Sequence, residues 1–326
     1  MTRSACLIFN PVSGQGDSEA DLKQIRSLLE PEIKLDIQFT TEEVDAGELA
    51  RQAVANGVES VIASGGDGTL SAATEALVET KIPLGIISRG TANAFAAALG
   101  IPDTIEAACQ TILAGKTRVV DSARCNGKPM ILLAGVGFEA EAVESADREA
   151  KNRYGMLAYI LSGLDKLREL GSSEFEAKIE TDEQVITVTA AALTIANAAP
   201  PTSILAQGPA GIIADDGLLD ITIVAPANRI EAIASAYHLL QTAFRDEATK
   251  RDDIGYLQAK RLQVSTSPPQ KVVMDGEIIG TTPIEVECIP SSLTIFVPVT
   301  SLEEPAEKLE GLPGLKIETK PDKNHQ

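Results

Sequence analysis

The sequence predicts a two-domain α+β protein, in which an α/β domain is followed by a β-rich domain. Up to about Asp121, short apolar runs alternate with helical segments, which is the pattern of βαβ units on a largely parallel sheet. Beyond Asp121 the chain is dominated by runs rich in Val, Ile and Thr, which indicate strands that we expect to be mostly antiparallel. The 326 residues are enough for about two domains of ordinary size.

Strands of the first domain are expected where short apolar runs end at polar or glycine-rich segments: Ala5–Phe9, Leu35–Phe39, Val58–Ala63, Pro83–Ile87 and Thr117–Asp121. Two helices between them are indicated by apolar residues that share one face, namely Leu22, Ile25 and Leu29, and then Leu49, Ala50 and Ala53. Ligands of open α/β sheets bind at the carboxyl ends of the strands, so the glycine-rich segments there are the first candidates for a site.

The second domain is expected to contain seven runs as strands: Glu174–Thr181, Val185–Ala196, Leu219–Val224, Leu262–Thr266, Val272–Met274, Ile284–Ile289 and Leu293–Val297. Two helices interrupt them, at Tyr154–Leu170 and near Arg229–Ala243, and the apolar stripe of the first indicates core packing. The polar tail from Glu303 to Gln326 either frays or lies back on the first domain.

Composition argues against several classes of protein. The chain has 28 Lys and Arg against 47 Asp and Glu, a net charge of −19, so it would repel a phosphate backbone and nucleic acid is not an expected partner. The apolar stretch Ala5–Phe9 is too short for a signal peptide, and no apolar run approaches the ~20 residues of a membrane helix. Four dispersed cysteines favour neither a zinc site nor a disulfide framework: Cys6, Cys109, Cys125 and Cys288. A cytoplasmic protein is expected.

The strongest local signal is the segment Ser64–Thr69, with the sequence SGGDGT, which follows an expected strand and opens a helix. Its three glycines permit close backbone approach, so several N–H groups can point at one anion near the helix N-terminus. The segment lacks the Lys-Ser/Thr of a Walker loop, so positive charge must come from elsewhere, and Asp67 points to a metal ion. The alternative is a tight strand-to-helix turn with a capping aspartate.

Two further loops follow neighbouring strands, at residues 10–16 and 88–93, and offer hydroxyl, amide and backbone groups. Together the three loops predict a nucleotide pocket at one sheet edge, although each alone consists of ordinary turn and cap residues. The segment Gly135–Ala140 matches a dinucleotide fingerprint formally, but no acidic strand end follows about twenty residues later, so we expect a glycine-lined turn.

Two acidic turns lie in the second domain. Asp215-Asp216-Gly217 offers the oxygen donors that Mg²⁺ prefers, and it also has the composition of a simple Asp-Gly turn. Asp275-Gly276-Glu277 is by itself an Asp-Gly hairpin.

Five motifs, in their order along the chain, resemble those of the diacylglycerol kinase catalytic-domain family, in particular the soluble bacterial lipid kinases. The motifs are Asn10–Gly14, Gly65–Thr69, Gly90–Asn93, Asp215–Gly217 and Asp275–Glu277. Gly-Gly-Asp-Gly alone is shared with NAD kinases and resembles the phosphofructokinase loop, whereas the late Asp-Gly-Glu favours a lipid kinase. The resemblance implies a nucleotide-binding α/β domain, similar to that of NAD kinases and phosphofructokinases, at residues 1–121 and 300–326. It implies a β-sandwich-like lipid-substrate domain at residues 122–299.

The resemblance also implies site residues. ATP would contact residues of four segments: Asn10, Pro11, Val12, Ser13, Gly14, Thr40, Gly66, Asp67, Gly68, Thr69, Leu70, Ser71, Ala72 and Thr91. Glu277 would be the general base, and Asp67, Asp121 and Asp215 would form a network near a catalytic Mg²⁺. A separate structural Mg²⁺ would bind Asp216 and the carbonyls of Ile213 and Leu218.

The expected function is therefore an ATP-dependent lipid kinase acting on a hydroxyl of diacylglycerol or a related lipid. Members of the family commonly have Asn-Glu where this chain has Ser71-Ala72, and Asp where it has Ala94. These departures keep two alternatives open: an NAD-kinase-like kinase of a soluble metabolite, and a nucleotide-binding protein that has lost phosphoryl transfer.

A lipid acceptor implies contact with a membrane surface. One hypothesis is that basic residues flanking the helix at 154–170 face the inner surface of the membrane, namely Lys151, Arg153, Lys166 and Arg168. The alternative is a core helix with solvated ends. An edge strand of either sheet could pair with a second copy and form a homodimer.

Overall fold

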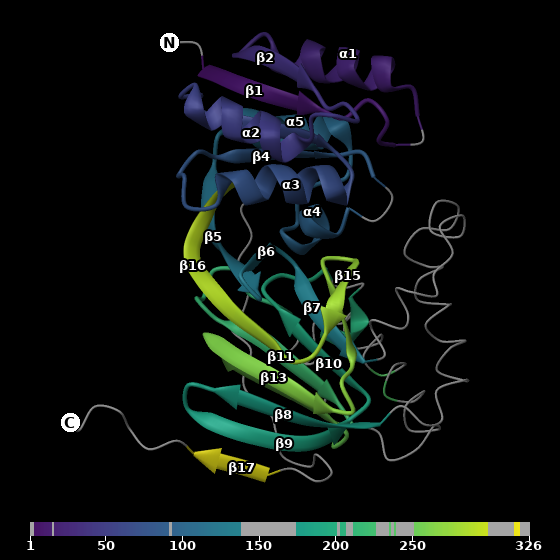
Figure 1. The fold of residues 1–326 in the computed structure, drawn as a ribbon. Coiled ribbons are helices and arrows are strands. Elements are labelled where there is room, and N and C mark those ends of the chain that lie inside the picture. Colours follow the sequence, from purple (N-terminus) through teal and green to yellow (C-terminus); the bar gives the residue numbers. More distant parts are fainter. Residues whose placement is uncertain are drawn as a thin grey trace, which may run out of the picture. The chain divides into compact units, whose positions relative to one another are not determined.

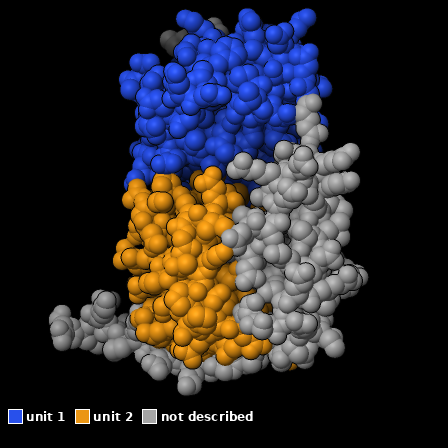
Figure 2. Space-filling view, turned by 45° about the vertical axis from the view of Figure 1, so that its right-hand side comes forward, with its two compact units in different colours: residues 1–122, 290–302 blue, residues 123–289, 303–326 orange. Residues whose placement is uncertain are grey.

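The computed structural model describes residues 3–14, 16–90, 93–137, 174–200, 203–206, 211–225, 235, 238, 251–298 and 316–319. The chain forms two compact units, which Figure 2 colours separately. Unit 1 comprises Met1–Ser122 and Pro290–Leu302, and unit 2 comprises Ala123–Ile289 and Glu303–Gln326. Two strands, β5 (Thr117–Cys125) and β16 (Ile284–Phe296), contribute residues to both units.

Unit 1 alternates strands and helices, as expected for βαβ units. Its elements are β1 (Arg3–Phe9), α1 (Ser18–Leu29), β2 (Ile33–Phe39), α2 (Ala46–Ala55), β3 (Val61–Gly65), α3 (Asp67–Leu77), β4 (Leu84–Ser88), α4 (Ala94–Ala98), α5 (Ile105–Ala114) and the start of β5. The sheet order is β4-β3-β1-β2 with every pair parallel, and β16 pairs with β4 through Ile295 and Leu84.

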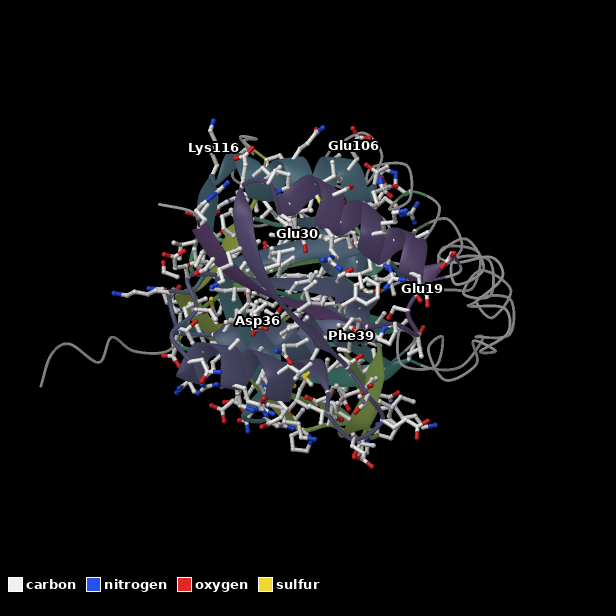
Figure 3. All side chains as sticks on the ribbon, turned by 90° about the horizontal axis from the view of Figure 1, so that it is seen from above. Glu19, Glu30, Asp36, Phe39, Glu106 and Lys116 are labelled. Carbon is white, nitrogen blue, oxygen red and sulfur yellow. The ribbon has the colours of Figure 1, made fainter. Side chains whose placement is uncertain are left out.

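Helices cover both faces of this sheet. Helices α2 and α3 lie on one face and α1 and α5 on the other, which can be followed in Figures 1 and 3. The N-cap of helix α1 is Asp17, whose carboxylate accepts hydrogen bonds from the Glu19 and Ala20 amides. Apolar side chains from β1, α1 and α5 form one core, with Leu7, Ile25 and Ile112 almost inaccessible to solvent. Burial of this apolar stripe is the main force that holds the helices on the sheet.

Unit 2 consists of two sheets. One has the order β17 (Lys316–Thr319), β9 (Gln184–Ala190), β8 (Phe175–Thr181), β13 (Arg261–Ser267) and β16, with β5 and β6 (Lys128–Met130) beside it. The other has the order β12 (Ile254–Ala259), β11 (Leu219–Val224), β10 (Ala192–Ala196), β7 (Leu133–Gly137), β14 (Lys271–Met274) and β15 (Glu277–Thr281). The short helix η1 spans Ile204–Ala206. A single core joins residues of both sheets, including Phe175 and Ile179 of β8 and Val136 and Leu193 of the other sheet.

The antiparallel pairing expected for the second domain is confirmed where expected strands pair with one another: β8 with β9 and β13, β10 with β11, and β13 with β16. Two strand expectations were wrong. The run Val185–Ala196 is two strands, β9 and β10, which belong to different sheets and are separated at Ala191. Conversely, the runs at 284–289 and 293–297 join in the long strand β16, which passes through Ser291 at a φ of 53°. Periodicity cannot detect either event, because both depend on which neighbour each residue pairs with.

Other elements were not expected from the sequence: α4, α5, β6, β7, η1, β12, β15 and β17. The segment beginning at Gly135 was expected to be a turn, and its residues 135–137 instead end strand β7. The helix expected at 154–170, with its flanking basic residues, lies outside the described residues, as does most of 229–243. No helix among the described residues is long and apolar enough to cross a membrane.

The end of the chain is placed differently from the expectation that residues 300–326 return to the first domain. Strand β17 pairs with β9 and belongs to unit 2, whereas residues 290–302 belong to unit 1. Strand β17 beside β9 and the end of β16 beside β4 are stabilised for the same physical reason. Each added strand pairs with backbone groups that would otherwise be unpaired at the edge of a sheet.

Candidate active site

Three loops of unit 1 meet at one edge of the parallel sheet. Strands β1, β3 and β4 are neighbours, so their carboxyl ends lead into Asn10, Gly66 and Arg89 at the same edge. Hydrogen bonds fix the loops to one another: Asn10 Nδ2 donates to Thr69 Oγ1 at 2.8 Å, and the Gly66 amide donates to Ser13 Oγ at 3.3 Å. The two loops expected at residues 10–14 and 66–69 are therefore neighbours in the folded chain.

The backbones of two loops approach so closely that only glycine fits. A Cβ atom on Gly90 would lie 2.8 Å from Gly66 Cα and 2.9 Å from Asn93 Oδ1. Gly14 has a φ of +93°, and a Cβ atom there would lie 2.9 Å from the Arg89 carbonyl oxygen. The three loops therefore form a backbone-lined surface with few side chains, as close approach to a phosphate requires.

Helix α3 opens on this surface. Its N-cap is Gly66, which has no side chain, so the first-turn amides of α3 lack a side-chain cap. These amides, together with the helix dipole, favour an anion at this position.

The alternative interpretation of this loop was a tight turn in which Asp67 caps the following helix. Asp67 does not cap helix α3. It is the first residue of α3, and its carboxylate accepts from the Ala94 amide at 2.7 Å, at the start of α4. Burial raises the pKa of Asp67, and hydrogen bonds from the Ala94, Phe95 and Asn93 amides oppose this effect.

The other expected residues of unit 1 lie in several environments. Thr40 follows β2, and its amide donates to the Phe9 carbonyl at 3.1 Å. Asp121 is buried in β5 and accepts from the Ser291 amide at 2.6 Å. Leu70 lies in the core of unit 1. Ala72 packs near α2, since a Cβ atom on Gly47 would lie 3.0 Å from its carbonyl oxygen.

Pro11 and Val12 form the exposed part of the first loop, and Thr91 lies outside the described residues. Gly68 and Ser71 are in the first two turns of α3. No role was assigned to Arg89 from the sequence, where it was only one residue of the loop at 88–93. In the structure it contacts the other two loops at this edge of the sheet.

In unit 2, Asp275 and Gly276 form the turn between β14 and β15, and Glu277 directly follows it. Asp275 and Gly276 have φ values of 48° and 90°, so the expected Asp-Gly hairpin is confirmed. The Asp275 carboxylate accepts hydrogen bonds at 2.9 to 3.0 Å from three consecutive amides, those of Ile131, Leu132 and Leu133. Glu277 follows at the start of β15 with an exposed side chain. A rigid turn therefore presents Glu277 to solvent.

The Asp215–Asp220 segment of unit 2 contains a connected set of polar groups. Asp215 is exposed, and Asp216 accepts from the Leu218 amide at 2.9 Å, which closes the turn. Gln258 Nε2 lies 3.2 Å from Asp216 Oδ2 and 3.1 Å from Asp220 Oδ1. Asp220 is buried, and its Oδ2 has no hydrogen-bond partner among the residues that the structure describes. Burial and the neighbouring Asp216 charge raise the pKa of Asp220 to about 7.

Asp220 and Gln258 were not assigned from the sequence. Asp220 follows the Asp-Asp-Gly motif by three residues, which was a usable signal, whereas Gln258 lies in the unexpected strand β12. Ile213 is buried beside this turn. No group of three or more His, Cys, Asp or Glu side chains within the described part of the chain could hold a metal ion. A cation there would therefore need carbonyl oxygens or water in addition to carboxylates.

The geometry thus defines a two-unit protein with a backbone-lined sheet edge in unit 1 and two fixed acidic turns in unit 2. Residues 4–125 match the diacylglycerol kinase catalytic domain, and residues 133–297 match the YegS C-terminal NAD kinase β-sandwich-like domain. The chain belongs to the diacylglycerol kinase catalytic-domain family. This confirms the expected kinase family, and with it the α/β domain followed by a β-sandwich-like domain.

Individual relatives agree with this assignment. An uncharacterized protein of Synechocystis sp. is 50% identical over 91% of this chain and 71% of its own length. Diacylglycerol kinase of Bacillus subtilis is 30% identical over 94% of this chain and 99% of its own length. A solved structure from Bacillus anthracis aligns with a TM-score of 0.74 at 27% identity, covering 91% of this chain and 98% of that chain.

Proposed function

We propose that this protein is an ATP-dependent lipid kinase that transfers the γ-phosphoryl group to a hydroxyl of diacylglycerol or a related lipid. The observation that carries the proposal is the backbone-lined edge of unit 1, where Gly66 and Gly90 approach closely and α3 opens without a side-chain cap. A nucleotide's phosphates fit this edge, because they need amide donors and space that a Cβ atom would fill. Membership of a kinase family supports the same reading.

ATP would bind along the loops that follow β1, β2, β3 and β4. In this proposal Asn10–Gly14, Thr40 and Gly66–Ala72 surround the nucleotide, together with Thr91. Hydrogen bonds already hold Asn10 and Ser13 against the glycine loop, so little ordering is required when the phosphates bind.

Glu277 is the proposed general base. A lipid hydroxyl is a poor nucleophile at neutral pH, so a carboxylate within hydrogen-bond reach must accept its proton as the phosphoryl group moves. Glu277 is exposed, and the Asp275 turn fixes the backbone that carries it. The side chain is therefore available to an acceptor without unfolding of β15.

Magnesium is the proposed metal. Asp216 and the carbonyls of Ile213 and Leu218 would hold a structural ion, and Asp67, Asp121 and Asp215 would lie near a catalytic one. The oxygen donors of the Asp215–Asp220 turn suit this ion, and the buried Asp220 Oδ2, which has no hydrogen-bond partner among the described residues, offers one more oxygen there. When bound, Mg²⁺ would supply positive charge to the phosphate oxygens.

The test is transfer of labelled γ-phosphate from ATP to vesicles that contain diacylglycerol, phosphatidylglycerol, ceramide or sphingosine. We expect label in the organic phase with at least one of these lipids. Label that stays in the aqueous phase on a metabolite such as NAD would indicate a kinase of a soluble acceptor. ATP binding without any labelled product would indicate a nucleotide-binding protein.

Replacement of Glu277 by Gln tests the base. We expect a loss of ~10²–10⁴ in transfer rate, because the amide cannot accept the proton, while ATP affinity and thermal stability stay unchanged. The matched control is Glu285→Gln, which changes an exposed carboxylate of β16 in the same unit. Transfer by Glu277→Gln at the wild-type rate would remove Glu277 from the mechanism.

A further inference from the structure

Arg89 is a charged side chain that unit 1 buries at its candidate nucleotide edge. Its side chain is only 2% exposed. The Nε group donates to Asp21 Oδ2 at 2.8 Å, and Nη1 donates to the Asn10 carbonyl at 2.8 Å. The guanidinium carbon lies 4.3 Å from the centre of the Phe9 ring. The third nitrogen, Nη2, is buried and has no hydrogen-bond partner within the described part of the chain.

The position of Arg89 relates it to all three loops. Its amide donates to the Gly65 carbonyl at 2.8 Å, at the start of the glycine loop. A Cβ atom on Gly14 would lie 3.8 Å from Nη2, so this unpaired group faces the loop at 10–14. Gly90, the next residue, makes the close approach to Gly66. The guanidinium therefore lies directly behind the backbone surface proposed to hold the phosphates.

The loops otherwise lack positive charge. Arg89 is the only Lys or Arg in the segments 10–14, 64–72 and 88–93, and Asp67 adds a negative charge. A nucleotide triphosphate is strongly anionic, and phosphate-binding loops of other kinases and ATPases supply a lysine for this purpose. Burial makes a cation costly unless it is paired, and Arg89 has one carboxylate partner, Asp21, which is 27% exposed.

Resting on the proposed nucleotide-binding function, we propose that Arg89 supplies the positive charge that the glycine loop lacks. Asp21, on the first turn of α1, determines how much of that charge the phosphates experience. The guanidinium acts through the loop: it holds the Asn10 carbonyl by one hydrogen bond and attracts the phosphates across the backbone of residues 10–14. Arg89 is thus a positioning residue that selects for the charge of the nucleotide.

The two partners give opposite predictions. Arg89→Gln keeps a hydrogen-bond donor and removes the charge, so we expect ATP affinity to fall about 10-fold while adenosine affinity changes less than about twofold. Asp21→Asn keeps an oxygen that can accept from Nε and removes the competing anion, so we expect ATP affinity to rise about threefold. If Arg89 only braced the loop, Asp21→Asn would weaken ATP binding or leave it unchanged.

Titration calorimetry with ATP and with adenosine, on the full chain at several KCl concentrations, measures these affinities. Arg89→Lys should recover part of the preference for ATP over adenosine, because charge returns without the planar contacts. The proposal would be overturned if Arg89→Gln lost as much affinity for adenosine as for ATP, or if Asp21→Asn gained no affinity for ATP. If Arg89→Gln does not fold, Asp21→Asn alone decides.

The same measurement separates this inference from the function on which it rests. Wild-type protein that binds no ATP would refute both. Wild-type protein that binds ATP but phosphorylates no lipid would refute the lipid kinase alone, and the affinities of the variants would still decide the role of Arg89.

Discussion

At the scale of single residues, the Asp275 carboxylate accepts three consecutive backbone amides, those of Ile131, Leu132 and Leu133. Asp275→Ala would leave these amides without their acceptor and place alanine at a φ of 48°, so we expect a loss of ~2–4 kcal/mol in the free energy of unfolding. Asp275→Gly removes the carboxylate but tolerates this φ, and should cost less by ~1 kcal/mol. Urea denaturation of the three proteins measures both effects, and equal stability of the Ala variant and the wild type would contradict them.

Residue-level prediction from the sequence succeeded where a motif carries its own geometry. The Asp-Gly pair at 275–276 specifies a turn because both residues accept positive φ, and the turn is present. The three amides that hold Asp275 could not be predicted, since they come from a segment about 140 residues away in the chain. Arg89 was overlooked for the same reason: its partners Asp21 and Asn10 become neighbours only when β4 and β1 join one sheet.

At the scale of elements, β4 and α5 pack at a position where glycine is required by space. A Cβ atom on Gly85 would lie 2.8 Å from Ile112 Cδ1. We expect Gly85→Ala to cost ~1–3 kcal/mol, because the core must shift to accept one methyl group. Ile112→Val removes the Cδ1 atom, so the double variant should be more stable than the sum of the two single changes predicts, by at least ~0.5 kcal/mol. Exact additivity in thermal or urea denaturation would show that the two side chains do not meet.

The strands of unit 1 were predictable because each carries a fully apolar run between turn signals, as parallel strands buried on both faces do. The observed β3 and β4 differ from the expectation by only a few residues at their ends. The sheet assignment of β9 and β10 was not predictable, because the separation at Ala191 leaves the apolar pattern almost continuous. A change of sheet is decided by pairing partners, which periodicity does not encode.

At the scale of the whole molecule, unit 1 is discontinuous in sequence. The segment 290–302 reaches it only after the chain has built most of unit 2. Its contacts within unit 1 are specific: the Ser291 amide donates to Asp121, Ser292 Oγ lies 2.8 Å from Ser122 Oγ, and Ile295 pairs with Leu84. Leu293 and Ile295 are almost completely buried. The last strand of unit 1 is therefore supplied by the end of β16.

This connectivity predicts how the chain can be divided. A fragment of residues 1–122 should be at least ~3 kcal/mol less stable than the same fragment with residues 290–302 joined through a flexible glycine-serine linker. It loses several hydrogen bonds and the buried apolar side chains of Leu293, Ile295, Phe296 and Val297. Circular dichroism during urea denaturation compares the two. A linked fragment carrying Ile295→Ser is the control, and it should behave like the short fragment because a buried hydroxyl replaces the apolar contact. Equal stability of all three would mean that unit 1 folds without β16, and the proposed nucleotide-binding edge would then depend on residues 1–122 alone.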